Sequence, residues 1–311
     1  MRGILVSGQK IFEPRQWLGG TELMMLALEK HVIPHVPSLA DWNWIVAPGE
    51  INLREDGKNI AWVHLGEFEG DLSWLEHPLV AHVIFVSHFQ YQRFTERYRI
   101  AHKSHVLKNA ITPLKNKKKP TDTINLIFHS EPYRGLDILL DALSQIEDED
   151  IRLHVFGDLN TDTIDWKIEF QDAIKERCEK DSRVVLHGRT SNKEVRKQLQ
   201  KTHIFAYPST WRETSCLCLI EALSAGCLCV TSNLTALPET SMGFANHYEM
   251  RYEPSQHVDT LVPELKSAIK VVRSGFDSTI QKTIIDDAYS WESRLLDWIN
   301  FSHKIGPAKT G

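Results

Sequence analysis

The stretch from Trp211 to Gly226, WRETSCLCLIEALSAG, predicts a loop followed by a helix. The apolar run Ile204–Tyr207 just before it has the length of a buried strand, and Pro208 marks a turn after it. Ser215 is a residue type that often caps helices, and apolar residues recur at helical spacing after it. Together with the preceding strand, the stretch therefore predicts one strand–loop–helix unit of an α/β fold.

Two carboxylates lie in this unit, Glu213 in the loop and Glu221 inside the helix. At 1.5 Å per helical residue, Glu221 is expected roughly 9 Å beyond the cap. The unpaired N–H groups of the first helical turn lie between the two acids, and with the helix dipole they favour an anion. A ligand with a central phosphate and hydroxyl-bearing rings at both ends would fit, and a nucleotide-diphosphate sugar has that form.

The rest of the chain alternates short apolar strands with amphipathic helices, as expected for parallel sheets covered on both faces. Strands are expected at residues 3–6, 44–47, 60–63, 82–86, 123–128, 151–156, 184–186 and 204–207, and helices at 20–29, 89–98 and 135–144. A basic segment bounded by prolines, residues 113–120, is typical of a linker. With 311 residues, the chain is long enough for two domains. Ligands of such sheets bind beyond the carboxyl ends of the strands.

Composition limits the function classes. The 42% hydrophobic and 25% charged residues are typical of a globular protein, and a net charge of −5 argues against nucleic acid as a partner. No apolar run reaches the roughly 18 to 20 residues that span a bilayer, so we expect a cytoplasmic protein. The lysines of the linker are expected to be solvated; the alternative is peripheral contact with an anionic membrane surface.

Four cysteines lie in or near the helix that is predicted after Ser215: Cys216, Cys218, Cys227 and Cys229. Two C-x-C pairs separated by eight residues do not match the usual zinc arrangement. We therefore expect small buried thiols and no metal site. The acidic run 147–150 is expected to be a solvated turn.

Several motifs together resemble one known family. The spacing of Glu213 and Glu221 resembles the E-x7-E motif of retaining GT-B glycosyltransferases, family 4 in particular, also known as glycosyl transferases group 1. Other segments resemble that family's markers in the same order: 19–23, 106–111, 132–140, 184–188, 236–239 and 289–292. The sequence departs from the family where Thr214, Ser215 and Cys216 replace Pro-Phe-Gly. It also departs at the phosphate segment, whose usual Arg falls on His129 or is missing, and whose Lys is Arg134.

The resemblance implies a GT-B fold, in which two Rossmann-like domains face each other across a cleft, here with a short N-terminal domain. Its implied domains are residues 1–112 on the acceptor side, 113–285 for the nucleotide sugar, and a C-terminal helix within 286–311 that crosses back to the first domain. The implied activity is metal-independent transfer of a sugar, with retention, from a UDP- or GDP-sugar to a hydroxyl of a glycan or glycoconjugate. No cofactor is implied.

The resemblance also implies roles for individual residues. Catalytic roles fall on Glu213, His64 and Arg134. Nucleotide-sugar binding falls on Gly19, Gly20, Asn109, Ser130, Arg134, Arg189, Ser215, Cys216, Leu217 and Glu221.

Ordinary structural roles remain open for each of these residues, such as a surface salt bridge for Arg134 or a packed ring for His64. For the whole protein, the altered phosphate loop and the short first domain also fit a non-catalytic nucleotide-sugar-binding or scaffold subunit of a glycan-assembly complex. A sugar-nucleotide epimerase with this fold is a third hypothesis, which would require more acid and base residues around the sugar.

Overall fold

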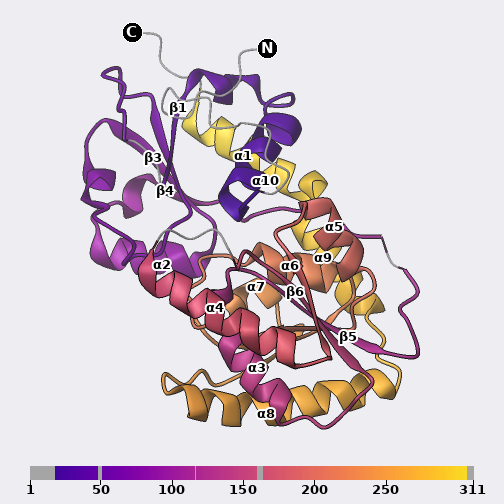
Figure 1. Cartoon of the computed structure of the whole chain (residues 1–311). Helices are drawn as coiled ribbons and strands as arrows, with labels where there is room; N and C mark the ends of the chain where they lie inside the picture. The colour runs from indigo at the N-terminus through magenta and orange to yellow at the C-terminus, as the bar shows by residue number, and fades with distance from the viewer. Residues whose placement is uncertain (1–17, 48–50, 116, 160–163, 307–311) are drawn as a thin grey trace. The chain divides into compact units, whose positions relative to one another are not determined.

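The computed structural model describes residues 18–47, 51–115, 117–159 and 164–306 (Figure 1). The strand predicted at residues 3–6 lies outside these ranges. The chain divides into two compact units, one formed by Met1–Thr112 with Asp287–Gly311, the other by Pro113–Asp286. Within the described residues, no helix is long and apolar enough to cross a membrane.

The first unit contains a parallel four-stranded sheet in the order β1-β2-β3-β4. Its strands are β1 (Asn43–Ala47), β2 (Asn59–Val63), β3 (Val80–Phe85) and β4 (Ser104–Val106). Its helices are α1 (Gly20–Ala27), a π-helical turn (Leu28–Val32), α2 (His88–Arg97), α10 (Trp291–Ile305) and the 3-10 turns Pro37–Asp41, Ser73–Glu76 and Ala101–Lys103.

The two faces of this sheet carry different apolar clusters. On one face, Trp298 of α10 lies 5.5 Å from Trp62 and 6.0 Å from Trp44, measured between ring centroids, and all three side chains are buried. The other cluster includes Val63, and Phe94 of α2 is buried within it. The C-terminal helix thus supplies part of the first unit's core.

The second unit contains a parallel six-stranded sheet in the order β10-β9-β8-β5-β6-β7. Its strands are β5 (Ile124–His129), β6 (Ile151–Phe156), β7 (Val184–Gly188), β8 (Ile204–Tyr207), β9 (Leu228–Ser232) and β10 (Ala245–Tyr248). Its helices are α3 (Leu136–Ser144), α4 (Asp165–Lys180), α5 (Asn192–Leu199), α6 (Leu217–Ser224), α7 (Leu237–Ser241), α8 (Pro254–Arg273) and the 3-10 turn Pro132–Arg134. The chain then enters α9 (Thr279–Tyr289), which runs across the boundary between the units.

The strand order of the second unit indicates where a ligand is expected to bind. Counted from β5, the six strands follow the 3-2-1-4-5-6 order of a Rossmann fold. All strands are parallel, and the direction in which successive strands are added to the sheet reverses between β5 and β8. Ligands of such sheets bind beyond the carboxyl ends of the strands at this reversal. The predicted strands and helices from residue 44 onward are confirmed, with their ends shifted by a few residues.

Candidate functional site

The loops that follow β5 and β8 meet at the reversal point of the second sheet. The turn Pro132–Arg134 follows β5, and the chain from Pro208 to Cys216 follows β8. Gly135 allows the two loops to touch, because it has a φ of 111° and a Cβ there would lie 2.0 Å from the carbonyl oxygen of Pro208. The backbone therefore brings two distant segments into direct contact.

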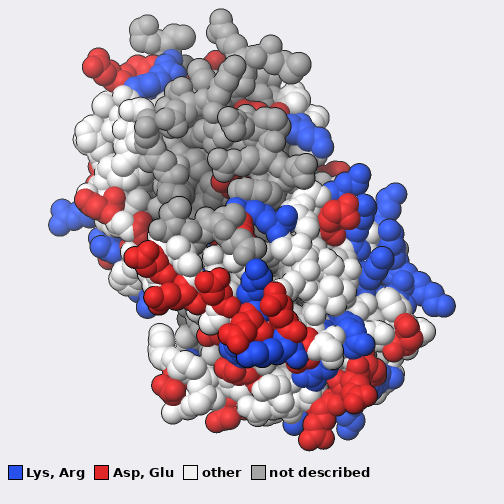
Figure 2. Space-filling model, in the orientation of Figure 1, with Lys and Arg blue, Asp and Glu red and all other residues white. Residues whose placement is uncertain are grey.

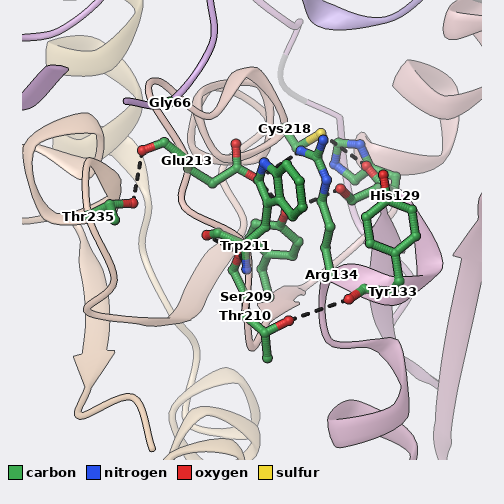
Figure 3. Close-up of polar contacts among 12 residues, drawn as sticks. Gly66, His129, Tyr133, Arg134, Ser209, Thr210, Trp211, Glu213, Cys218 and Thr235 are labelled. Atoms are coloured by element: carbon green, nitrogen blue, oxygen red, sulfur yellow. Dashed lines mark hydrogen bonds and ion pairs between the residues drawn. The ribbon is translucent and has the colours of Figure 1, made fainter. Parts of the chain in front are cut away.

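Arg134, Glu213 and Tyr207 form a polar network where the loops meet. Glu213 and Tyr207 are buried and Arg134 is half-buried. Figure 3 shows Arg134 and Glu213 of this network, with Trp211 beside them. The Tyr207 hydroxyl donates to Glu213 Oε1 at 2.6 Å, and Arg134 Nη1 donates to the same oxygen at 3.1 Å. Ser130 Oγ lies 3.2 Å from the Tyr207 hydroxyl. The Arg134 guanidinium also lies over the Trp211 ring, 4.9 Å from its centroid. These contacts hold one positive and one negative group in fixed positions.

The electrostatics of this network keep Arg134 charged. Burial raises the pKa of Glu213, while Arg134 and Tyr207 oppose that shift. Burial acts to lower the pKa of Arg134, but the Glu213 carboxylate and Tyr207 outweigh it, so its pKa is raised. Among the described residues, Arg134 Nε has no hydrogen-bond partner. A donor of the guanidinium is thus left without a bond beside the loop that leads to α6.

The second carboxylate, Glu221, lies inside α6 as expected. Its Oε1 forms an ion pair with Nη1 of Arg196, a residue of α5, at 3.3 Å, and its side chain is mostly buried. Burial raises the pKa of Glu221, while Arg196 and His129 oppose the shift. Glu221 is therefore not a surface acid, and Arg196 is a partner that the sequence did not indicate.

The expectation that Ser215 caps this helix is wrong. Helix α6 begins at Leu217, so its N-cap is Cys216, whose side chain makes no capping hydrogen bond. A thiol is a weak hydrogen-bond acceptor, and the N–H groups of the first turn are left without a side-chain cap. The Cys218 thiol in this turn donates to the carbonyl oxygen of His129 at 3.0 Å, at the end of β5. The helix N-terminus is thus positioned at the same loop junction as Arg134.

The other predicted site residue of the second unit, Arg189, follows β7 and pairs with Asp158 at 2.8 Å. The two pairs Cys216 and Cys218, and Cys227 and Cys229, contain free thiols. In the described part of the chain, no group of three or more His, Cys, Asp or Glu is arranged to hold a metal ion.

The remaining predicted residues lie in the first unit. Gly19 is the N-cap of α1 and Gly20 is its first residue. His64 follows β2, with its ring 4.7 Å from that of Trp62, and burial lowers its pKa to about 3, so the imidazole is neutral. Asn109 is buried. For all predicted residues of both units, the functional roles remain predictions.

Sequence reasoning missed Tyr207 and the aromatic residues near Arg134, namely Tyr133, Trp166 and Trp211. Tyr207 and Trp211 lie in the predicted strand and loop, but Ser130, which contacts Tyr207, and Arg134, which contacts Trp211, are each 77 positions away in the chain. The contact of Tyr207 with Glu213 spans only six positions, but it depends on how the loop folds back. The only available signal was their position at or after the carboxyl ends of predicted strands.

Comparisons with known proteins agree with this architecture. Residues 125–261 match the model of the family Glycosyl transferases group 1. A glycosyltransferase from Rickettsia africae ESF-5 is structurally similar, with 16% identity, a TM-score of 0.66, and coverage of 80% of this chain and 70% of that chain. HepE from Anabaena, solved with UDP-glucose, gives 15% identity and a TM-score of 0.63, covering 78% and 71%. The pneumococcal O-GlcNAc transferase GtfA, solved with UDP and GlcNAc, gives 13% and 0.63, covering 85% and 57%.

The class that the fold defines is GT-B, with two Rossmann-like parallel sheets. The match over residues 125–261 supports the glycosyl transferases group 1 family, and it lies entirely within the second unit. No curated protein sequence matches the chain significantly.

Proposed function

We propose that the protein is a glycosyltransferase that moves a sugar from a nucleotide-diphosphate sugar to an acceptor hydroxyl of a glycan or glycoconjugate. The observation that carries this proposal is the Arg134–Glu213–Tyr207 network beside the uncapped N-terminus of α6. It lies at the reversal point of a Rossmann-like sheet and inside the family match. Because HepE and GtfA were solved with UDP ligands, a UDP-sugar is the first donor to test, and a GDP-sugar the second.

Positive charge for the leaving diphosphate comes from Arg134 and from the N–H groups at the start of α6. Preorganised donors aimed at developing negative charge stabilise a transition state without reorganising during the reaction. The backbone N–H groups of Cys216 and Leu217 and the hydroxyl groups of Ser130 and Ser215 add donors of the same kind. We infer that this set replaces a metal ion at the diphosphate.

The two carboxylates have separate tasks in this proposal. Glu221, oriented by Arg196, accepts hydrogen bonds from the ribose hydroxyls. Among the described residues, Arg134 and Tyr207 both donate to Glu213 Oε1, and we assign Oε2 to a hydroxyl of the transferred sugar. Arg189, in the loop after β7, is assigned to the base.

We propose retention of configuration, with the leaving phosphate accepting the proton of the acceptor hydroxyl. This route needs no separate base, and a neutral His64 would act as a hydrogen-bonding group toward the donor sugar. Gly19, Gly20 and Asn109 are assigned to the same donor, through close backbone approach and an amide. These roles rest on the family resemblance.

A cytoplasmic location with peripheral membrane contact is the accompanying proposal. Exposed lysines gather on the second unit over α5 and the segment before β5 (Figure 2): Lys115, Lys117, Lys118, Lys193, Lys197 and Lys201. Each basic residue near an anionic bilayer contributes about 1 kcal/mol of attraction. Acceptors carried on a membrane would be reached from this surface.

The central test is incubation with UDP-, GDP- and ADP-sugars and measurement of released nucleotide, with and without a panel of candidate acceptors. A transferase releases nucleotide in an acceptor-dependent manner. A binding or scaffold subunit binds a nucleotide by calorimetry without turnover. Glu221→Ala should abolish detectable binding, whereas Glu176→Ala, which removes an exposed helical carboxylate that also pairs with a cation, should not.

Metal independence is tested separately by chelation. Turnover should survive EDTA, because Arg134 and the α6 N-terminus meet the phosphate charge. Loss of turnover that is restored by magnesium or manganese would show that a metal takes part.

A further inference from the structure

Three aromatic side chains, from a turn, the start of a helix and a loop, lie next to one another near Arg134. Tyr133 lies in the turn after β5, Trp166 is the second residue of α4, and Trp211 lies in the loop after β8. The Tyr133 ring centroid is 6.0 Å from that of Trp166 and 5.9 Å from that of Trp211. Thr210 Oγ1 donates to the Tyr133 carbonyl oxygen and links two of the loops (Figure 3). We call these three rings the aromatic platform.

The aromatic platform is exposed to solvent, unlike an ordinary core cluster. The Trp166 side chain is 55% exposed, and Tyr133 and Trp211 are half-buried. Exposing an indole forgoes the stabilisation that burial of its apolar surface would give. An exposed aromatic group beside a polar site is typical of a ligand-binding surface.

Cations border the aromatic platform on both sides. Lys167 Nζ lies 4.9 Å from the Tyr133 centroid and 5.7 Å from that of Trp166. The Arg134 guanidinium lies over Trp211 at 4.9 Å. The rings are thus combined with N–H donors, and a ligand there would meet apolar surface and hydrogen-bond donors together.

The ring angles distinguish between two kinds of ligand. Tyr133 is inclined by 70° to Trp166 and by 69° to Trp211, so both pairs meet edge to face and form a corner. A flat nucleobase is held best between parallel rings, and neither pair provides such a slot. A pyranose ring is thicker, with a face of C–H groups that can lie on an indole and hydroxyl groups at its rim that can accept from a lysine.

We propose that the aromatic platform binds a pyranose ring of the acceptor saccharide. The proposal rests on the proposed transferase function, because Tyr133 is adjacent in sequence to Arg134 and Trp211 covers its guanidinium. It places an acceptor-binding surface on the second unit, next to the group assigned to the diphosphate. Trp166 stacks on the C–H face of the sugar, and Lys167 donates to its hydroxyl groups.

The test uses the full chain on immobilised mono-, di- and trisaccharides of glucose, galactose, mannose, N-acetylglucosamine and glucuronic acid. We expect the wild type to retain at least one saccharide, Trp166→Ala to bind it at least about tenfold more weakly, and Trp166→Phe to keep most of the affinity. An affinity ratio of ten corresponds to about 1.4 kcal/mol. The matched control is Tyr252→Ala, which removes another exposed aromatic ring of the second unit, 83% exposed, and should leave binding unchanged.

Calorimetry with UDP and GDP on the same variants separates the two proposals. Unchanged nucleotide affinity in Trp166→Ala, together with lost saccharide binding, supports the aromatic platform. Saccharide binding that depends on Trp166 in a protein that binds no nucleotide would support the aromatic platform and overturn the proposed transferase. Absence of any saccharide binding by the wild type, equal binding by Trp166→Ala, or equal loss of nucleotide and saccharide would overturn the inference.

Discussion

The two aromatic clusters of this protein use the same residue types in opposite ways. In the first unit, Trp44, Trp62 and Trp298 are at most 2% exposed and lie between the sheet and α10. In the second unit, Trp166 is 55% exposed and neighbours a lysine. The first cluster gains its stabilisation from leaving water, whereas the second remains partly hydrated beside charged groups.

This difference shows that residue type alone does not reveal whether an aromatic cluster serves folding or binding. The two clusters differ in the burial of their side chains and in the presence of neighbouring cations. We therefore expect substitutions in the first cluster to change stability and substitutions in the second to change ligand binding, and each prediction below tests one side of that contrast.

The largest effect is expected for Trp298→Ala. Removing a fully buried tryptophan leaves a cavity, and such substitutions cost about 3–5 kcal/mol. Denaturant unfolding, followed by near-ultraviolet circular dichroism, measures the loss. The control is Leu296→Ala on the same helix, 62% exposed, which should change stability by less than about 0.5 kcal/mol. Equal effects of the two variants would mean that α10 does not contribute to the core as described.

Next in size is Arg134→Ala, which should weaken nucleoside diphosphate binding by about 1.5–3 kcal/mol, the value of hydrogen bonds to a charged group. Binding of the corresponding nucleoside should change much less, since it lacks the phosphates. Calorimetry on both ligands gives the comparison, with Arg177→Ala as a control for the loss of an ion-paired arginine of the same unit. Equal losses for nucleoside and diphosphate would indicate a general defect of the fold.

A smaller effect concerns two histidine pairs in the described part of the chain: His82 with His105 on β3 and β4, and His154 with His187 on β6 and β7. Burial, and then the neighbouring imidazole, lowers the pKa of both His105 and His154 to about 4. Because an unfolded histidine titrates near 6.5, the unfolded state binds more protons between pH 6.5 and pH 4. Stability should therefore be fully present above pH 6.5 and fall as the pH drops through this window.

Urea unfolding measures this pH dependence at about pH 7, which is above the unfolded histidine pKa, and at about pH 6 and 5, which are below it. His154→Gln should flatten it relative to the wild type, since the amide does not titrate. An unchanged slope would show that His154 does not contribute to acid sensitivity.

The smallest effect is expected for the stability of Trp166→Ala. An exposed side chain contributes little to the folded state, so the free energy of unfolding should change by less than about 0.5 kcal/mol. The same unfolding assay as for Trp298→Ala measures it. A loss of several kcal/mol would make the aromatic platform a structural cluster, and the contrast between the two units would disappear.

The sequence by itself determined most of the secondary structure. Mainly apolar runs of four to six residues between turn-forming residues correspond to β1, β2, β5, β6 and β8, because a strand covered on both faces carries apolar side chains at most positions. The polar exceptions Arg152 and His154 of β6 are only half-buried. The position of Glu213 in a loop and of Glu221 in a helix followed from the same local pattern. The capping residue did not follow from this pattern. The helix begins one residue later than predicted, and its start depends on how the preceding loop packs.

Only the tertiary structure decided the partners of the site residues. Arg134 and Glu213 are 79 positions apart, and Arg196 lies on a different helix from Glu221. Local periodicity carries no information about such pairs, since it reflects only which face of an element is buried. Arg134 and Glu213 meet because β5 and β8 are neighbours in the sheet, so the loops at their carboxyl ends converge. Gly135 leaves the space for that convergence.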